Sequence, residues 1–376
     1  MNVLGIHLTL LIGPSVPVPA PLFLIESLQR VEVTHRDSSR SGFQITFQIG
    51  RSGPADLLDY QHLSSPLLRP FNRIILIVTF NATPRVLMDG IITNQQMQPG
   101  NEPGTSTLTI TGEDISVMMS RVERIIKRDG QSDQIKATMI LKDYPQYGLV
   151  PNVIPPLTVE TPNPLEITLV QRGTDLALLQ SMARCHGYVF YIVPGPVPFA
   201  NTAYWGPPVR EGEQRALTFN MGPDSNVTSL NFQYNSLSPV MVSGNMMDRQ
   251  TKQSMPVEIS KSTRTPLVSQ PASTLPYIFK VLPENTQGES YMQALACTQG
   301  RIDASFDNTV TAQGELDALQ YGDLLQARKL VGLRGAGHSY DGSYYVQSVT
   351  HTISSGEYKQ HFTLTREGTG ALSPVV

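Results

Sequence analysis

Two acidic residues, Glu315 and Asp317, have the types and the spacing that acid–base chemistry could use. On a β-strand, residues two apart point to one face and lie roughly 6.5–7 Å from each other. Glycosidases use two carboxylates at comparable separations, but those carboxylates flank the sugar from opposite sides. The pair is the only support for a glycoside hydrolase, which is the least favoured interpretation of this sequence.

His351 and His361 could bind a metal ion if they shared one face of a strand pair. The tight turn at Ser355-Gly356 predicts a hairpin in which His351 faces Gln360 across the two strands. In that register His361 lies on the opposite face. The sequence therefore predicts no metal site and no cofactor.

The neighbours Cys185 and His186 resemble the nucleophile and base of a thiol enzyme. We expect them on a helix, where adjacent side chains point about 100° apart and cannot form that hydrogen bond. Cys185 is instead expected to pack as a small apolar residue. Because the only other cysteine is Cys297, we expect neither a disulfide framework nor a zinc cluster, and folding in a reducing compartment.

The glycines at 332, 335 and 337 imitate a dinucleotide-binding loop. That chemistry requires a helix directly after the glycines, with its N-terminus at the phosphates. Here the following residues, 339–349, have a strand pattern. We interpret the glycines as a loop between strands, and the protein as one without enzymatic activity.

The composition limits the classes of partner. The chain has 376 residues, a net charge of −3 and only 16% charged residues. It has no excess of positive charge that would attract a nucleic acid or an anionic membrane. Its low content of charged residues favours a surface that is covered in an assembly. The apolar N-terminus lacks a positive region and contains several prolines, so we expect a first strand rather than a signal peptide. No apolar run reaches the length of a membrane helix.

The elements that would position these residues are mainly strands. Residues 31–111 alternate as strands, with a turn at Asp89-Gly90. Asp114 is placed to cap a helix that runs to Ile126. Ser132 is placed to cap a second helix, whose inward residues would be Ile135, Met139 and Ile140. Further along we expect a strand–helix–strand unit at 167–193 capped by Thr174 or Asp175, strands at 217–245, a loop or linker at 250–285, a helix at 291–302 and strands thereafter.

Residues 74–114 and 324–368 share one layout. Each contains an apolar strand, an Asp-Gly pair, a second strand, a hairpin and a strand that ends in an acidic corner. This similarity indicates an internal duplication.

Residues 314–368 resemble the C-terminal signature of the phage late control D proteins, the baseplate hubs of contractile tails. RGTDLALLQSMARCHGYVFYIV (172–193) resembles the central strand–helix–strand of that family. FNMGPDSNVTSLNFQYNSLSP (219–239) resembles the segment that follows, and SGFQITF (41–47) resembles part of the first barrel. The resemblance covers nearly the whole chain in order.

The resemblance implies a homotrimer whose two tube-like barrels per chain join a three-fold spike to a six-fold tail tube. It implies as partners a spike protein, which we expect to be a separate chain, the tail tube protein, and other baseplate and wedge proteins, with the tape-measure protein as a further candidate. It places the protein in a virion tail baseplate or phage-tail-like particle assembled in the bacterial cytoplasm. The residues that match the family's pattern, which we interpret as structural and interfacial, are Arg172, Gly173, Thr174, Asp175, Gly314, Tyr321, Gly322, Asp341, Gly342, Tyr345, His351, Tyr358, Arg366 and Glu367.

We therefore expect a mainly β fold with an α+β insertion and two tube-like β-barrel domains of related plan. The first barrel would be residues 1–114, completed by strands from about 212–245. The inserted α+β domain would be 115–211, and the second barrel, with its linker and helix, 246–376. The predicted function is a structural hub of a contractile tail or injection system. A β-rich carbohydrate-binding protein is the alternative, for which Trp205, in a loop-like stretch, is the best support.

Overall fold

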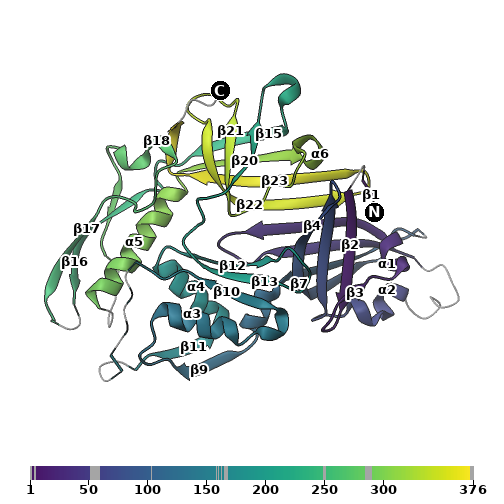
Figure 1. The fold of residues 1–376 in the computed structure, drawn as a ribbon, viewed down its shortest axis with the longest axis horizontal. Coiled ribbons are helices and arrows are strands. Elements are labelled where there is room, and N and C mark those ends of the chain that lie inside the picture. Colours follow the sequence, from purple (N-terminus) through teal and green to yellow (C-terminus); the bar gives the residue numbers. More distant parts are fainter. Residues whose placement is uncertain are drawn as a thin grey trace.

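The computed structural model describes the chain except residues 1, 4–5, 51–59, 103, 158, 160, 162, 165–167, 249–250, 284–289 and 373–376. The described residues form the predicted mainly β fold with several helices. Most of their strands belong to one 14-stranded, largely antiparallel sheet. Figure 1 shows two β regions, with helices below them and an arm at the far end. Within the described residues, no helix is long and apolar enough to cross a membrane.

The first β unit has the strand order β1-β2-β6-β7-β8-β5-β4. Its strands alternate between core and surface, so that every second residue of β5 from Phe43 to Ile49 is buried. The short helices add Leu24 and Leu68 to the same core. Its elements are β1 (Asn2–Val3), β2 (Ile6–Gly13), β3 (Val18–Pro19), α1 (Leu22–Glu26), β4 (Leu28–Arg36), β5 (Gly42–Ile49), α2 (Gln61–Ser64), the 3₁₀ turn η2 (Pro66–Leu68), β6 (Arg73–Phe80), β7 (Thr83–Gln98) and β8 (Ser106–Asp114).

The second β unit has the order β14-β21-β22-β23-β20-β15 around its own core. Its elements are β14 (Glu213–Thr218), η5 (Gly222–Asp224), β15 (Val227–Tyr234), β20 (Val310–Asp317), α6 (Ala318–Tyr321), β21 (Leu330–Arg334), β22 (Gly342–Ser354) and β23 (Glu357–Arg366). The predicted hairpin register is confirmed, because His351 pairs with Gln360 across β22 and β23.

The expectation that strands at 212–245 complete the first unit is wrong. β14 pairs with β21 and β15 pairs with β20, so both strands belong to the second unit. The sequence gives each strand an alternating pattern but does not indicate its partner, which lies 76 to 117 positions further along the chain (Tyr234 to Val310 and Glu213 to Leu330).

The two units repeat one plan. Numbered along the chain, the six strands β2, β4, β5, β6, β7 and β8 lie in the order first, fourth, fifth, sixth, third, second. The strands β14, β15, β20, β21, β22 and β23 lie in the same order. The β2–β6 pair is antiparallel, whereas the β14–β21 pair is parallel.

Irregularities recur at equivalent places in the two units. The β7–β8 ladder shifts register between Ile92 and Asn94, and the β22–β23 ladder shifts between Val346 and Ser348. A second shift lies between Leu28 and Arg30 in β4, and its counterpart lies between Val227 and Ser229 in β15. Shared bulges support a duplicated plan because bulges are specific features of a strand pairing.

The Asp-Gly pairs that suggested the duplication are not equivalent. Asp89 and Gly90 lie inside β7 rather than in a turn, and Asp89 is ion-paired with Arg73 at 2.7 Å. A side chain at Gly90 would meet the Glu113 carbonyl at 2.6 Å, so close strand packing explains this glycine. Gly342 instead opens β22 with a φ of +118°.

One contact joins the units edge to edge. β22 pairs with β21 through its first residues and with β4 through Ser348–Ser354, so the two sheets become continuous. In Figure 1, β22 and β4 meet where the two β regions adjoin.

The inserted α+β region has its own core, which includes Leu179, Ile140 and Trp205. The predicted strand–helix–strand unit is confirmed, with Thr174 accepting a hydrogen bond from the N–H of Ala177 at the helix start. The region contains η3 (Ile115–Ser120), β9 (Glu123–Lys127), α3 (Asp133–Lys142), η4 (Pro145–Tyr147), β10 (Leu149–Val153), β11 (Val170–Thr174), α4 (Asp175–Cys185), β12 (Val189–Pro194) and β13 (Asn201–Gly206).

The predicted helix from Asp114 to Ile126 is wrong beyond its first turns. Asp114 caps a 3₁₀ segment, but Glu123–Lys127 forms β9, which pairs with β11. Pairing with a distant strand overrides the local helical spacing. The helix capped by Ser132 is present, although Ile135 and Met139 are each 46% exposed and only Ile140 of the three points inward.

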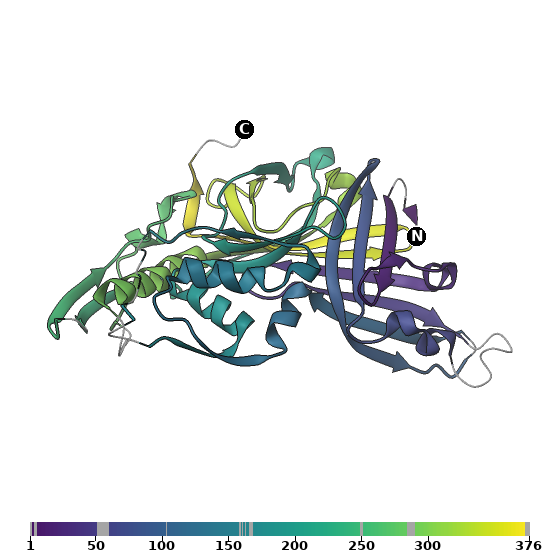
Figure 2. The same cartoon turned by 60° about the horizontal axis from the view of Figure 1, so that its bottom comes forward.

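The arm is built from the segment predicted to be a linker, together with the helix α5. Residues 251–283, the described part of that segment, contain three short strands and a 3₁₀ turn. Figure 2 shows α5 running along the arm toward the centre of the molecule. The elements are β16 (Val240–Met247), β17 (Ser254–Ile259), β18 (Val268–Pro271), η6 (Ala272–Thr274), β19 (Phe279–Val281), α5 (Tyr291–Asp307) and β24 (Gly368–Ala371), with which β18 pairs.

Candidate functional site

Asp175, the last residue of the central motif at 172–175, anchors the inserted region, whereas Arg172 is exposed on β11. Asp175 is 1% exposed and accepts hydrogen bonds of 2.7 Å from the Tyr144 hydroxyl and the Gln171 amide. Burial, followed by the nearby Asp175 carboxylate, raises the pKa of Tyr144. Gly173 has a φ of +113° immediately before the cap. These contacts fix β11, α4 and η4 against one another.

The signature residues of the second β unit hold its turns. Arg366 donates hydrogen bonds to the carbonyls of Asp341 (3.0 Å) and Ser339 (2.6 Å), and its guanidinium lies 4.2 Å from the centre of the Tyr344 ring. The Asp341 carboxylate accepts a bond of 2.8 Å from the N–H of Ala336. Burial lowers the pKa of Arg366. Charge and aromatic packing together close the glycine loop.

Three further signature residues lie on β20 and on the helix α6 that follows it. The Tyr321 hydroxyl donates to the Arg215 carbonyl at 2.6 Å, and Gly322 ends α6 with a φ of +72°. A side chain at Gly314 would meet the Phe362 ring at 2.5 Å. Each residue is explained by a turn or by close packing.

His351 and Tyr358 are buried at the seam between the units. The side chain of Gln360 bonds both backbone groups of Leu325, which fixes its amide nitrogen as the donor to His351 Nδ1 at 3.2 Å. The Tyr358 hydroxyl also lies 2.9 Å from Nδ1. Because Nδ1 must accept, the neutral imidazole carries its hydrogen on Nε2. Burial lowers the pKa of His351 to about 3.

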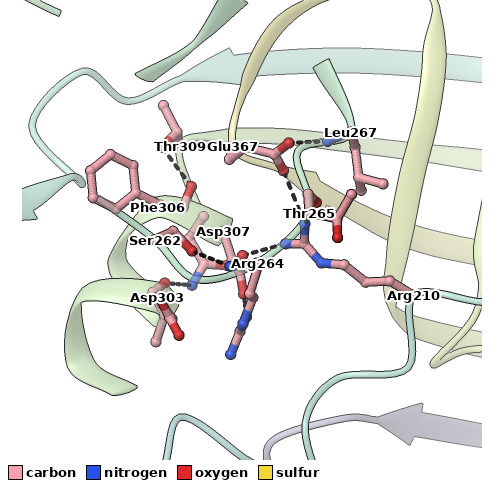
Figure 3. Close-up of polar contacts among 12 residues, drawn as sticks. Arg210, Ser262, Arg264, Thr265, Leu267, Asp303, Phe306, Asp307, Thr309 and Glu367 are labelled. Atoms are coloured by element: carbon pink, nitrogen blue, oxygen red, sulfur yellow. Dashed lines mark hydrogen bonds and ion pairs between the residues drawn. The ribbon is translucent and has the colours of Figure 1, made fainter. Parts of the chain in front are cut away.

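Glu367 belongs to a buried charged cluster that joins the arm to the second β unit. Figure 3 shows its members converging: Asp307 pairs with both Arg210 and Arg264, and Arg210 also lies 3.5 Å from Glu367. Glu367 accepts from the N–H of Leu267. Burial, followed by the repulsion of Arg210, lowers the pKa of Arg264 to about 10. We call these residues, together with Asp303, the arm junction.

Sequence reasoning missed most of the arm junction. Asp303 and Asp307 are four apart on α5, a spacing that places two carboxylates on one helical face and could have indicated a charged contact. Asp303 accepts bonds from the N–H (2.9 Å) and hydroxyl (2.7 Å) of Thr263. Arg210 and Arg264 lie in loops without a distinguishing pattern. The carboxylates bind neighbouring arginines and loop groups, an arrangement suited to holding the arm.

The carboxylate pair that suggested a hydrolase has structural partners. Asp317 caps α6 and accepts from the N–H groups of Leu319 and Gln320. Glu315 is paired with Lys359 at 3.4 Å and with His361 at 3.5 Å. The two carboxylates thus hold different elements.

The structure also gives no catalytic or metal-binding arrangement to the histidine pair or to the glycine loop. His361 pairs with Thr350 and is largely exposed, whereas His351 is buried on the other face, as the hairpin register predicts. The glycine loop leads into β22 rather than a helix. Among the described residues, no group of three or more His, Cys, Asp or Glu side chains could hold a metal ion.

The expectation that Cys185 packs as an apolar residue and that the cysteines form no disulfide is wrong. Cys185 on α4 and Cys297 on α5 form a disulfide, with Cα atoms 4.1 Å apart. Gly300 makes this approach possible, because a side chain there would meet the Gly187 nitrogen at 2.3 Å. The helices were predicted, but their contact across 112 residues carries no local signal. His186 does not serve Cys185 and instead lies 2.9 Å from an Asp133 oxygen.

Trp205 does not form an exposed binding platform. It lies in β13 at 0% exposure, and its indole N–H donates to the Leu179 carbonyl at 3.1 Å. The main support for a carbohydrate-binding surface is thereby removed.

The fourteen signature residues do not form one site. Arg172–Asp175 lie in the inserted region, and the others are distributed along the second β unit and its border with the arm.

Several solved structures have a similar fold. A tail protein from Neisseria meningitidis MC58 matches with a TM-score of 0.63 and 13% identity, over 96% of this chain and 97% of that chain. A 43 kDa tail protein of prophage MuSo2 from Shewanella oneidensis matches with a TM-score of 0.62 and 12% identity, over 96% and 98%. A type VI secretion component of Escherichia coli, described as structurally similar to the phage T4 tail proteins gp27 and gp5, matches with a TM-score of 0.55 and 12% identity, over 93% and 77%.

No family model matches the sequence, and no curated protein matches it. At these identities the structural matches establish the fold alone. The chain has the fold of phage tail proteins along almost its whole length.

Proposed function

We propose that this protein is a structural hub of a contractile phage tail or contractile injection system, of the late control D type. Three copies would join a three-fold spike to a six-fold tail tube. The observation that carries the proposal is the end-to-end match with two tail proteins, one of them from a prophage, which covers at least 96% of each chain.

The repeated plan supports the symmetry conversion. A spike with three-fold symmetry and a tube with six-fold symmetry need an adaptor that offers six similar positions from three subunits. Two units with the same strand order and two bulges at equivalent places supply two positions per chain. Three copies in a closed ring then supply six.

The proposal assigns partners and roles. The partners are the spike, the tube protein, and other baseplate and wedge proteins, with the tape-measure protein as a further candidate, in a tail baseplate. The signature residues act structurally, by holding turns and junctions, or at interfaces. The tail proteins with the same fold, and the structural partners found for Glu315 and Asp317, favour a role without catalysis.

The test is the copy number in an assembled complex. The chain should be co-expressed with its spike protein, because spike contacts can be needed to template the ring. Native mass spectrometry should give three copies of this chain per spike trimer. A complex with one, two or six copies would contradict the proposal.

A further inference from the structure

Among the described residues, two of the open strand edges in the 14-stranded sheet belong to β15 and to the end of β7. β15 is the last strand in the order of this sheet and pairs with β20. In β7, pairing with β6 ends at Ile91, while pairing with β8 continues to Gln98 on the other side. Residues 93–98 of β7 therefore have no strand on the β6 side among the described residues.

These edges correspond to the two edges that join the units within the chain. In the repeated plan, β7 is equivalent to β22 and β15 is equivalent to β4. β22 ends its pairing with β21 at Tyr345 and then pairs with β4 from Ser348 onward. The part of β7 that is open is thus the part of β22 that binds β4.

The segment that leads into β6 contacts β7 in the same way as the segment that leads into β21 contacts β22. The N–H of Phe71 bonds the Ile92 carbonyl at 2.8 Å, and the N–H of Arg328 bonds the Val346 carbonyl at 2.7 Å. Phe71 and Arg328 have φ values of +70° and +69°. The segment before β21 leaves room for β4, so we expect the segment before β6 to leave the same room.

The side chains at the two open edges suit strand pairing in water-accessible surroundings. Thr93–Gln98 of β7 and most of β15 are exposed or half-buried. Gln96 and Gln233 are the counterparts of Thr350 and Thr34, whose hydroxyls lie 2.9 Å apart within the chain. Two glutamine amides can replace that hydroxyl pair because each both donates and accepts.

We infer that β15 of one copy pairs with residues 94–98 of β7 in the next copy, repeating the β4–β22 joint. The inference rests on the proposed function and specifies its subunit interface. The occupant of each open edge is a second copy of this chain.

The register follows from the equivalence of the bulges. Ile92 corresponds to Val346 and Leu28 to Val227, since each precedes a register shift at the same point. Transferring the β4–β22 ladder pairs Gln96 with Gln233. The strands are antiparallel, so the neighbouring pairs are Asn94 with Asn235, Gln95 with Tyr234, Met97 with Phe232 and Gln98 with Asn231.

In a closed ring of three copies, this joint alternates with the joint inside the chain. Each copy contributes one β4–β22 contact and one β15–β7 contact, which gives six similar joints. The edges that would otherwise invite aggregation are then paired.

Cysteine cross-linking tests the register. Gln96→Cys/Gln233→Cys and Gln98→Cys/Asn231→Cys are two matched pairs of exposed residues. The mismatched control, Gln96→Cys/Ser229→Cys, moves one thiol four residues along β15, roughly 13 Å. A disulfide cannot span that offset, since it needs Cα atoms within about 7 Å. The native cysteines are already bonded to each other.

Each variant is oxidised in the co-expressed complex with the spike protein and separated on a non-reducing gel. We expect both matched pairs to give covalent trimers, and the control to give at least about tenfold less cross-linked product, since its thiols are out of reach.

A trimeric complex in which the matched pairs stay uncross-linked, or in which the control links equally well, overturns the interface and leaves the proposed function standing. A complex without three copies overturns both.

Discussion

Reduction of the disulfide between Cys185 and Cys297 should destabilise the chain without changing its fold. The bond joins α4 to α5 across 112 residues. In the folded state these helices also touch through Gly187 and Gly300, and Arg264 donates to the Gly187 carbonyl at 2.6 Å. The contact therefore persists without the bond, and the main effect falls on the unfolded chain.

The expected magnitude follows from the length of the closed loop. In the chain-entropy model, closing a loop of about 110 residues stabilises the folded state by roughly 5 kcal/mol, and we take about 2–5 kcal/mol as the measurable range. The urea midpoint should then fall by about 1 M on reduction, at the denaturant dependence expected for a chain of this size.

The assay compares urea unfolding of the protein with and without a thiol reductant. Both cysteines line a cavity of about 660 Å³, which gives the reductant access. Alkylation and intact mass should count no free thiols before reduction and two after it. The control is the double variant Cys185→Ser/Cys297→Ser, whose midpoint should not respond to the reductant.

Two results would refute this reasoning. One is an unchanged midpoint although the mass shows two free thiols. The other is full alkylation of both cysteines before any reductant is added, which would mean that the bond is not formed.

Three further outcomes are expected. The pKa of His351 falls from 6.5 in the unfolded chain to about 3 in the folded chain, so its contribution to stability is complete above pH 6.5 and is lost on acidification. Between pH 7 and pH 5 the wild type should lose about 2 kcal/mol more unfolding free energy than His351→Gln does, and equal losses in the two proteins would contradict this. Gly342→Val should lower the unfolding free energy by about 1–2 kcal/mol or more, because a φ of +118° strains a branched residue, and wild-type stability would show the backbone assignment to be wrong. The unfolding free energy of Glu315→Gln/Asp317→Asn should lie within about 0.5 kcal/mol of the wild-type value, since asparagine also caps helices. Asp317→Ala should lower it by about 1 kcal/mol. A larger loss in the double amide variant would show that these carboxylates have a further role.

The elements that local patterns determine could be predicted from the sequence. The turn at Ser355-Gly356 and the alternation on both sides of it specify the register of β22 and β23, because a one-residue slip would move every side chain to the wrong face. Thr174 was predicted as one of two possible caps of α4, and it is the one that accepts the helix N–H.

The errors concern contacts between distant parts of the chain. Residues 123–127 have helical spacing but pair with β11. Trp205 has turn-forming prolines beside it, yet it closes the core of the inserted region. The disulfide depends on the packing of two helices. None of these outcomes has a signal within the few residues around it.

The duplication was predicted from the sequence, but the correspondence between its two copies was not. The similar layout of residues 74–114 and 324–368 pointed to a repeated plan, but the Asp-Gly pairs used to align them are not equivalent. The strand order and the bulges give the correct correspondence, and these depend on pairing that only the fold reveals.

Electron cryo-microscopy of the assembled tail end tests the central claim most directly. The account predicts three copies of this chain in a closed ring between spike and tube. In that ring the first and second β units alternate around the axis, and β15 of each copy meets β7 of the next. A ring of six copies, a position away from the spike–tube junction, or three copies whose β units do not alternate would contradict it.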